Sequence, residues 1–383
     1  MKKQKVMVWE TLATVSGGQK MTLKIMDMLS DYCEFCCLIP SEGLLSIELK
    51  KRGIQYILMG DQSLPTGVKG KKIIFLYAWM SIKNILKSLR AIYKFSPNAL
   101  YAPGPAALPW SSICGFLTCK PVIWHLHHIF IDGATVKLLN LCSCLPSVRK
   151  ILAVSDCVGK QITSNSSCDK ISVLYNPVDF EKYSSGNREC ISGEIEEKLS
   201  KNIFGSDGKN IIVGHIGLVQ STKRQAFVLD VAMELLSQGY NVTFLFAGEL
   251  RDEKYFSELK NKVKEYNLFN SVLFLGRRND IPDVLKLLDV LIIPSQEGFP
   301  LVGLEAASAG VPVVACDTAG AKEFINVSGS GYTFRENDVK SAALSIVNAI
   351  KDKQNLADSG KKFAKESTED LYAIKLKKIL DSL

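Results

Sequence analysis

S-Q-E-G-F-P-L-V-G-L-E-A, from Ser295 to Ala306, is the most informative stretch of this chain. It follows the apolar run D-V-L-I-I-P (289–294), which is typical of a strand buried on both faces of a sheet. A helix is predicted to begin near Pro300, because proline suits the first helical position, and to end at Gly310. The pattern therefore predicts a strand, a loop and a helix of an open α/β sheet.

Two carboxylates flank the predicted start of this helix. Glu297 lies in the loop at the carboxyl end of the strand, where ligands of open α/β sheets bind. The free amides of Leu301 and Val302 would point out of the helix N-terminus, where a phosphate is favoured. Glu305 lies one turn further, within reach of hydroxyl groups attached to that phosphate. By itself the pair would equally fit two solvated glutamates, so the surrounding residues matter.

The whole stretch resembles the signature of the retaining GT-B glycosyltransferases of family 4 (glycosyltransferase group 1), of the bacterial surface-polysaccharide type. The resemblance implies that Glu297 is a catalytic residue beside the transferred sugar and that Glu305 binds the donor ribose. It also implies that the G-F-P-L-V segment, with Phe299, Leu301 and Val302, folds around the diphosphate and sugar of the donor.

A second segment, from Leu218 to Gln225, resembles the part of the family in which an arginine and a later lysine neutralise the donor diphosphate. Lys223 stands at the lysine position. Leu218 replaces the arginine, which leaves the level of activity open, and Arg224 is the candidate to compensate for it. The segment G-R-R-N-D (276–280) resembles the loop beside the donor base and adds Arg277 to the donor-binding residues.

The first half of the chain contains weaker matches. Gly17 and Gly18 follow a predicted strand and open a helix, as in the glycine loop that lies under the donor phosphates in GT-B enzymes. His127 falls where the family has a strand-end histidine near the transferred sugar, so it is the second catalytic candidate. His125 fits a core and a functional role equally, whereas His215 inside its strand is expected to be structural. No acidic or thiol ligand completes a metal site around these histidines.

Strands and helices alternate along both halves, which predicts two doubly wound, Rossmann-like domains that face each other across a cleft. We expect an N-terminal acceptor-side domain (1–182), a linker region (183–209), a C-terminal donor domain (210–365) and a last helix (366–383) that can cross back onto the first domain. The predicted strands are 5–10, 35–40, 54–59, 99–102, 121–125, 151–155, 172–175, 211–217, 242–248, 272–276, 290–294 and 311–316.

Composition agrees with this architecture without selecting it. The 383 residues suit two domains, and the formal charge of +8 could attract an anionic nucleotide or lipid but is too diffuse to indicate nucleic acid. No run of 18 apolar residues predicts a membrane span, and residues 1–10 are interpreted as a strand rather than a signal peptide. Eleven irregularly spaced cysteines favour reduced thiols. We expect a cytoplasmic protein that can contact the inner face of the membrane peripherally.

The resemblance implies a hexosyltransferase that moves a sugar, with retention, from a UDP- or GDP-sugar to a hydroxyl of a glycan or lipid-linked glycan in capsule or O-antigen synthesis. No cofactor and no metal are expected. The donor base, the sugar, the acceptor, the linkage and the oligomeric state stay open. Two alternatives also stay open: a sugar-nucleotide epimerase, and a catalytically silent GT-B scaffold protein, for which Leu218 is the main argument.

Overall fold

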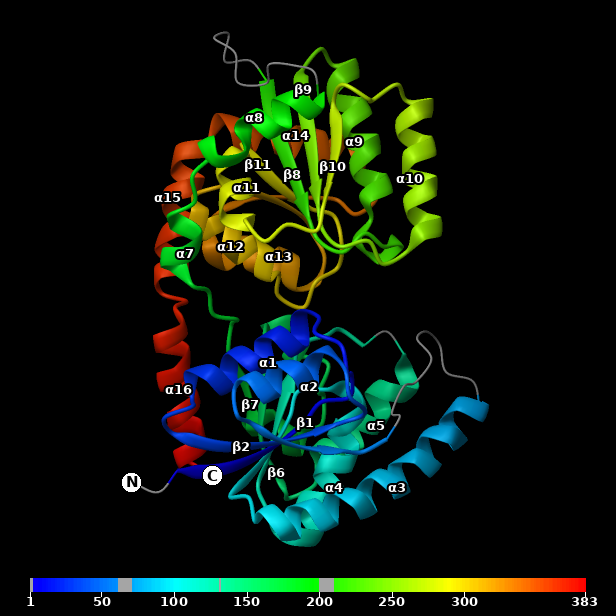
Figure 1. Ribbon diagram of the computed structural model, residues 1–383, viewed down its shortest axis with the longest axis vertical. Coiled ribbons are helices and arrows are strands. Elements are labelled where there is room, and N and C mark those ends of the chain that lie inside the picture. The colour runs from blue at the N-terminus through cyan, green and yellow to red at the C-terminus, as the bar shows by residue number, and fades with distance from the viewer. Residues whose placement is uncertain (1–2, 61–70, 131, 200–209) are drawn as a thin grey trace. The chain divides into compact units, whose positions relative to one another are not determined.

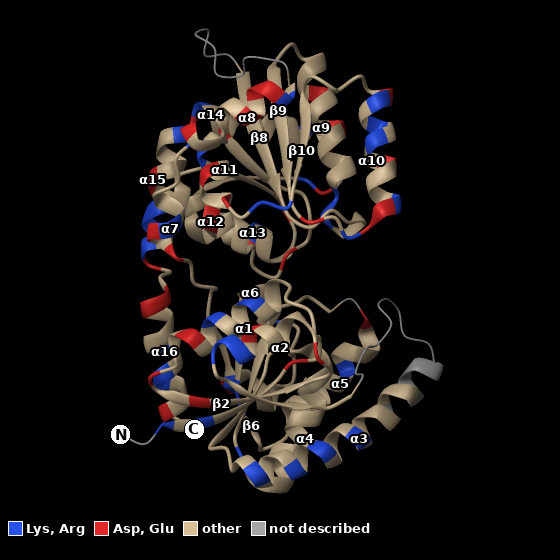
Figure 2. Cartoon of the chain, in the orientation of Figure 1, with Lys and Arg blue, Asp and Glu red and all other residues tan. Residues whose placement is uncertain are grey.

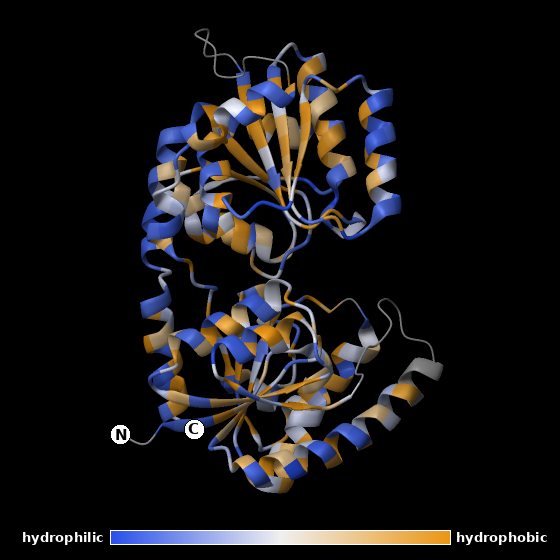
Figure 3. Cartoon of the chain, in the orientation of Figure 1, coloured by the Kyte–Doolittle hydropathy of each residue, from blue (hydrophilic) through white to orange (hydrophobic). Residues whose placement is uncertain are grey.

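The computed structural model describes residues 3–60, 71–130, 132–199 and 210–383 (Figure 1). The chain forms two compact units: Met1–Tyr175 together with Glu369–Leu383, and Asn176–Thr368. Each unit has its own parallel sheet and its own buried apolar core. Figure 3 shows that the apolar residues concentrate in the strands. The two-domain α/β architecture predicted from the alternation of strands and helices is therefore present.

The first unit is built on a seven-stranded parallel sheet with the strand order β3-β2-β1-β4-β5-β6-β7. The order reverses between β1 and β4, so the loops that follow these two strands diverge and leave room for side chains above them. The strands are β1 (Gln4–Trp9), β2 (Cys33–Ile39), β3 (Gln55–Leu58), β4 (Ala99–Ala102), β5 (Val122–Leu126), β6 (Val148–Ala153) and β7 (Ile171–Val173).

Helices cover both faces of this sheet, because successive side chains of a strand point to opposite sides. Val8 belongs to the apolar cluster beneath α1 and α16, whereas the neighbouring Trp9 donates a hydrogen bond to Ser88 of α3 on the other side (3.2 Å). The helices are α1 (Gly17–Met28), α2 (Leu44–Lys51), α3 (Lys71–Phe95), α4 (Leu108–Thr118), α5 (Gly133–Ser143), α6 (Asp156–Gly159) and α16 (Glu369–Asp381).

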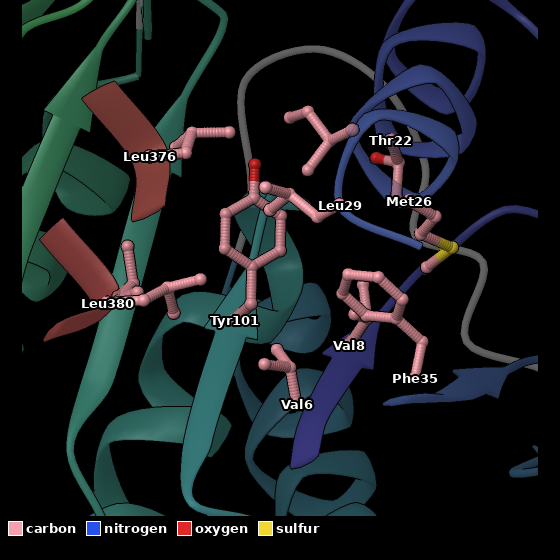
Figure 4. Close-up of a pocket in the computed structure, with 11 residues that line it drawn as sticks. Val6, Val8, Thr22, Met26, Leu29, Phe35, Tyr101, Leu376 and Leu380 are labelled. Carbon is pink, nitrogen blue, oxygen red and sulfur yellow. The ribbon is translucent and has the colours of Figure 1, made fainter. Parts of the chain in front are cut away.

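The C-terminal helix α16 is part of the first unit. Lys24 of α1 pairs with Glu369 at its start (2.7 Å), and Tyr372 and Leu376 join the apolar cluster. A small apolar cavity lies between the sheet, α1 and α16, and Tyr101 stands at its centre (Figure 4). Its walls consist of Val6, Val8, Thr22, Ile25, Met26, Leu29, Phe35, Tyr101, Ile123, Leu376 and Leu380.

The second unit repeats the plan with six parallel strands in the order β10-β9-β8-β11-β12-β13. Numbered within the unit this order is 3-2-1-4-5-6, the same as in the first unit without its seventh strand. The switch point therefore lies between β8 and β11, which pair through Val213 and Val290. The strands are β8 (Asn210–Ile216), β9 (Asn241–Ala247), β10 (Val272–Gly276), β11 (Val290–Ile293), β12 (Val313–Cys316) and β13 (Gly331–Phe334).

Nine α-helices are described in the second unit. One face of its sheet packs on α9, α10 and α14, whose apolar residues form the main core, and Ile293 on the other face contacts α12 at Gly303. The helices are α7 (Phe180–Ser184), α8 (Glu189–Leu199), α9 (Gln225–Ser237), α10 (Glu253–Glu265), α11 (Ile281–Leu287), α12 (Leu301–Ala309), α13 (Ala319–Ser328), α14 (Val339–Lys351) and α15 (Lys353–Lys365).

The boundaries between the units differ from the predicted ones. The first unit ends at Tyr175, and the expected linker (183–209) contains the end of α7 and all of α8, which pack on α11 of the second unit. Residues 200–209 of that linker lie outside the described residues. Val178, where the chain enters the second unit, and Thr368, where it leaves that unit, form a parallel bridge. Apolar residues Ile191, Ile195 and Leu199 explain why α8 is packed.

The strand predictions locate twelve of the thirteen described strands to within a few residues. The strand β13 was not predicted, because its G-Y-T-F sequence is short and has little apolar pattern. No helix in the described ranges is both long and apolar enough to cross a membrane.

Candidate active site

The loops after β8 and β11 bring together two side chains that are 74 residues apart in the sequence. Lys223, beyond the end of β8, places its Nζ 2.6 Å from Oε1 of Glu297, beyond the end of β11. Ser295 donates a second hydrogen bond to the same carboxylate oxygen (2.6 Å). About a quarter of each side chain of the pair is exposed, so it is open to a ligand from the solvent. Two of the sequence-predicted residues thus form a single charged group at the switch point of the sheet.

The backbone of the Glu297 loop is held from several sides. The Glu297 carbonyl accepts a hydrogen bond from the amide of Gly320 at the start of α13 (2.9 Å). A Cβ on Gly320 would lie 1.7 Å from the carbonyl oxygen of Gly298, so only glycine allows this approach. The G-A-K-E segment (320–323) therefore supports the loop that carries Glu297.

Phe299 is part of this support. Its ring is 5% exposed and packs edge-on against Phe324 of α13, with 5.5 Å between the ring centres. The buried amide of Asn176 donates to the Phe299 carbonyl (3.4 Å). The side chain of Phe299 thus anchors the loop in the core. The sequence motif alone does not tell such an anchoring residue from one that contacts a ligand.

The helix α12 begins one residue later than predicted. Pro300 is the N-cap residue, Leu301 is the first helical residue, and Gly310 ends the helix in the left-handed conformation with a φ of 76°. Pro300 O accepts from the amides of Gly303 and Leu304 (3.1 and 3.2 Å). The amides of Leu301 and Val302 come before these first internal bonds, so they occupy the anion-favouring end of the helix.

Glu305 lies one turn into α12, and its Oε1 accepts a hydrogen bond from the hydroxyl of Tyr183 in α7 (2.8 Å). Sequence reasoning placed Tyr183 in a linker and missed this contact. A tyrosine 122 residues away gives no local signal, because the contact arises only when α7 packs on α12.

Lys223 is positioned by a buried histidine. Nε2 of His215 lies 3.0 Å from the Lys223 carbonyl oxygen, so this nitrogen carries the proton and donates it. Burial lowers the pKa of His215 to about 4, which keeps the ring neutral. His215 is therefore a buried, neutral residue that holds the backbone of Lys223.

The side chain of Arg224 does not join the Lys223–Glu297 pair but contacts neighbouring loops. Its guanidinium donates to the carbonyl of Pro294 (3.1 Å) and to the side chain of Asn337, and it lies 3.6 Å from Glu336. These contacts hold Arg224 to the loops after β11 and β13. Leu218 is half-buried and supplies no charge at the position where the resemblance implies an arginine.

Arg277, directly after β10, is exposed. Its neighbour Arg278 pairs within the unit with Asp280 and Glu194, and the hydrogen bonds that it donates to Asp280 raise the pKa of its guanidinium. Of these two arginines, Arg277 is the one that stands open to a ligand.

In the first unit, Gly17 and Gly18 are the first two residues of α1, after the N-cap Ser16. A Cβ at either glycine would meet no atom within 4 Å. The packing of the chain therefore does not require glycine at these positions, and there is open space beside both residues.

A buried polar group lies at the carboxyl ends of β1, β4 and β5. Glu10 accepts hydrogen bonds from Gln19 (2.9 Å) and Thr22 (2.5 Å), and its burial raises the pKa of the carboxyl group. Nδ1 of His125 is hydrogen-bonded to Tyr101 OH, and burial lowers the pKa of His125 to about 3. Sequence reasoning did not single out Glu10, which reads there only as the polar end of a strand.

His127 follows β5, and its ring lies 4.0 Å from that of His125, centre to centre. Burial and the two neighbouring histidines lower the pKa of His127, so its imidazole is neutral at neutral pH. Its buried Nε2 has no hydrogen-bond partner within the described part of the chain. A neutral imidazole can exchange a hydrogen bond with an uncharged hydroxyl group.

No set of three or more His, Cys, Asp or Glu side chains among the described residues is arranged to hold a metal ion. All eleven cysteines are free thiols. In Figure 2 the ribbon of the second unit carries both red (Asp, Glu) and blue (Lys, Arg) segments.

Two Rossmann-like units with matching strand order define the GT-B class of fold, and solved structures agree. HepE of Anabaena in complex with UDP aligns with a TM-score of 0.81 and 20% identity over 99% of this chain and 100% of that chain. At this identity the likeness establishes the fold.

The sequence of the second unit is similar to that of known transferases. Residues 196–367 match the model of "Glycosyl transferases group 1". CapM, a capsular polysaccharide biosynthesis glycosyltransferase of Staphylococcus aureus, is 25% identical over 79% of this chain and 80% of its own length. An α-1,3-galactosyltransferase of Escherichia coli, which uses UDP-Gal and GlcNAc-diphosphoundecaprenol, is 30% identical over 48% of this chain. That match spans only 46% of the enzyme's own length.

Proposed function

We propose that this protein transfers a hexose, with retention, from a nucleoside diphosphate sugar to a hydroxyl group of a bacterial surface glycan carried on a lipid. The observation that carries the proposal is the Lys223–Glu297 pair at the β8/β11 switch point, beside the N-terminus of α12. A cation, free amides and a carboxylate together suit a ligand that has both a phosphate and a sugar hydroxyl.

Lys223 and the amides of Leu301 and Val302 would bind the diphosphate. A lysine held by one carboxylate keeps two further N–H donors for phosphate oxygens. As the bond from the sugar carbon to the phosphate oxygen breaks, negative charge grows on the diphosphate. Fixed donors that stabilise this charge lower the barrier without reorganising.

Three further side chains would bind the sugar and the ribose of the donor. Glu297 would orient the sugar, His127 would bind its hydroxyl groups as a neutral ring, and Glu305 would hold the ribose. The acceptor oxygen attacks from the side that the diphosphate leaves, and a phosphate oxygen takes the acceptor proton. This route gives retention without a nucleophile from the protein, and it needs no metal.

UDP is the favoured nucleotide, ahead of GDP. The support is that the structural neighbour HepE was solved with UDP and with UDP-glucose, and that the E. coli relative is named for UDP-Gal. The same relative, named for a diphosphoundecaprenol acceptor, supports a lipid-linked acceptor.

Calorimetry with UDP, GDP, ADP and CMP, followed by the corresponding sugars, tests the proposal. We expect selective binding of one diphosphate, unchanged by EDTA and lost in Glu305→Ala. Binding of none of them would favour the scaffold alternative. Release of an altered sugar without any acceptor would favour the epimerase alternative.

A further inference from the structure

The helix α3 of the first unit has an unusual composition. Its 25 residues, K-K-I-I-F-L-Y-A-W-M-S-I-K-N-I-L-K-S-L-R-A-I-Y-K-F, include six Lys and Arg and no Asp or Glu. In Figure 2 the described part of the α3 ribbon carries blue segments for Lys and Arg and no red ones. None of these residues belongs to the site proposed for the transfer reaction. Its role is therefore a separate question.

One face of α3 is packed on the unit by specific contacts. Trp9 donates a hydrogen bond to Ser88 (3.2 Å), and Trp110 of α4 donates to Ser81 (2.7 Å). Ala91 is buried on the same face. These contacts fix which side of the helix points away from the sheet.

The opposite face carries a row of exposed apolar side chains. Trp79, Ile82, Leu86 and Tyr93 follow a spacing of three, four and seven residues, which places them on one side of a helix. They are 54%, 55%, 58% and 89% exposed. Figure 3 shows this mixture of apolar and polar residues along α3. Four large apolar groups on one exposed helix face form a surface that monomeric proteins usually cover.

A basic row runs beside the apolar one. This basic row consists of four exposed residues: Lys83, Lys87, Arg90 and Lys94. They are four, three and four positions apart, so they lie on one side of the helix, next to the apolar row. The Nζ of Lys83 lies 5.0 Å from the centre of the Trp79 ring, so the two rows touch. Lys87 also donates to the Met59 carbonyl. An apolar row flanked by cations and free of acidic groups is the pattern of a helix that lies in a membrane interface.

The charge pattern selects among the partners that could cover this face. A second copy of the chain, bound about a two-fold axis, would bring the two basic rows together, which is unfavourable. A nucleic acid would contact Lys83 and Arg90 but would leave Ile82 and Leu86 in water. An anionic bilayer satisfies both rows, because headgroups pair with the cations and the apolar side chains enter the acyl boundary.

We propose that α3 docks the protein on an anionic lipid bilayer, with Trp79, Ile82, Leu86 and Tyr93 inserted at the interface and the basic row paired with headgroup phosphates. Cations near such a surface attract its anionic headgroups, and together with the apolar row they give reversible binding that weakens with salt. The proposal does not depend on the transferase function.

The chain contains its own reporter for this test. Of its four tryptophans, Trp9, Trp110 and Trp124 are at most 1% exposed, whereas Trp79 is 54% exposed. Vesicles of phosphatidylglycerol and phosphatidylcholine should shift the emission of the protein to the blue, and brominated acyl chains should quench it. Vesicles of phosphatidylcholine alone should do neither. Trp79→Phe should lose the emission change while the protein still floats with the anionic vesicles.

Two variants test the rows separately. Leu86→Glu should lower the fraction bound to anionic vesicles at least tenfold, and Lys83→Glu combined with Arg90→Glu should do the same at low salt. The matched control is Leu344→Glu, an equally exposed leucine (61%) on α14 of the second unit, which should bind like the wild type. Circular dichroism should show that all variants remain folded, because the replaced side chains are exposed.

The proposal is overturned if the protein does not bind anionic vesicles at low salt, or if Leu86→Glu and Leu344→Glu bind equally well. A concentration-dependent dimer that Leu86→Glu abolishes would assign the face to a second copy instead. Nucleotide binding measured on the same samples separates this outcome from a failure of the proposed function, since α3 contains none of the donor-binding residues.

Discussion

The two units share a strand order but differ in the chemistry at their switch points. In the second unit, the loops after β8 and β11 carry a partly exposed ion pair, Lys223 and Glu297. In the first unit, Glu10 directly follows β1, and His125 lies on β5, the strand next to β4; burial holds both side chains toward their neutral forms. The same scaffold thus presents charges on one unit and neutral hydrogen-bonding groups on the other.

This difference matches two kinds of ligand. Charged groups with some access to solvent suit a diphosphate, because charge-assisted hydrogen bonds to it offset the hydration that these groups lose on binding. Neutral buried groups suit the hydroxyl groups of a sugar, because an unpaired charge there would cost free energy. The fold therefore supplies the position, and the side chains at the strand ends determine the ligand class.

The largest effect is expected for the charged switch point. If the proposed role of Glu297 holds, Glu297→Gln should lower kcat by about 100- to 1000-fold, because it removes the charge that orients the reacting sugar. The free energy of unfolding should change by no more than about 1 kcal/mol, since the pair is partly exposed. The control is Asp230→Asn, which breaks a similar pair with Lys262 (2.7 Å) outside the site. Equal activity of the two variants would remove Glu297 from the mechanism.

The second prediction distinguishes the contribution of Glu305 to nucleotide binding from that of Tyr183, its hydrogen-bond partner. Glu305→Ala should raise the Kd of the nucleotide by about 10- to 100-fold, the worth of one or two hydrogen bonds to a charged group. Tyr183→Phe keeps the carboxylate and should change the Kd by less than about threefold. Calorimetry with UDP measures both. A larger effect of Tyr183→Phe would mean that the tyrosine itself binds the donor.

The third prediction concerns the neutral switch point. His125 stays neutral in the folded protein until about pH 3, whereas an unfolded histidine takes up a proton near pH 6.5. The stability that His125 contributes is therefore present above pH 6.5 and is lost as the pH falls from 6.5 toward 3. From pH 7 to pH 5 this loss amounts to about 2 kcal/mol.

Denaturant unfolding of the wild type and of His125→Gln at both pH values measures this loss. Glutamine keeps a neutral polar group beside Tyr101 but does not titrate, so the variant should lose less stability on acidification. The buried His215 acts in the same direction in both proteins and cancels in the comparison. His127 does not cancel, because His125 itself helps to lower the pKa of His127, and its change in the variant adds to the expected difference. Identical pH slopes would show that His125 is not held neutral.

The smallest effect is expected at the glycines of α1. Gly17→Ala should raise the free energy of unfolding by about 0.5 kcal/mol, because alanine restricts the unfolded chain and its Cβ meets no atom within 4 Å. If a ligand approaches this helix end, the same change should lower activity. The control is Gly133→Ala, at the equally open start of α5. Unchanged activity in both variants would remove the α1 loop from the site.

Much of the fold could be predicted because strands in parallel sheets are buried on both faces. Runs such as 290–294 are apolar throughout, and the alternation with helices implies parallel pairing. The strand β13 has no such run, and α8 lies in a stretch whose composition resembles a linker, although Ile195 and Leu199 are buried there. Local composition does not report packing against a distant element.

The sequence likewise predicted the residues of the candidate site but not the contacts between them. Glu297, Glu305 and Lys223 carry a local motif, so the sequence identified them. The local sequence does not indicate which of these side chains meet. Three such contacts are Lys223 with Glu297, Tyr183 with Glu305, and Arg224 with Asn337. Phe299 lies inside the motif but is buried, so its side chain anchors the loop.

The sequence by itself determined the α/β class, the two-domain plan and the residues with charge-bearing chemistry, because periodicity and motifs are properties of neighbouring residues. Only the tertiary structure decided which of these residues meet, where the units divide, and which face of α3 is exposed. Those properties depend on contacts between residues far apart in the chain. Their free energy comes from burial and hydrogen bonding that exist only after the elements have packed.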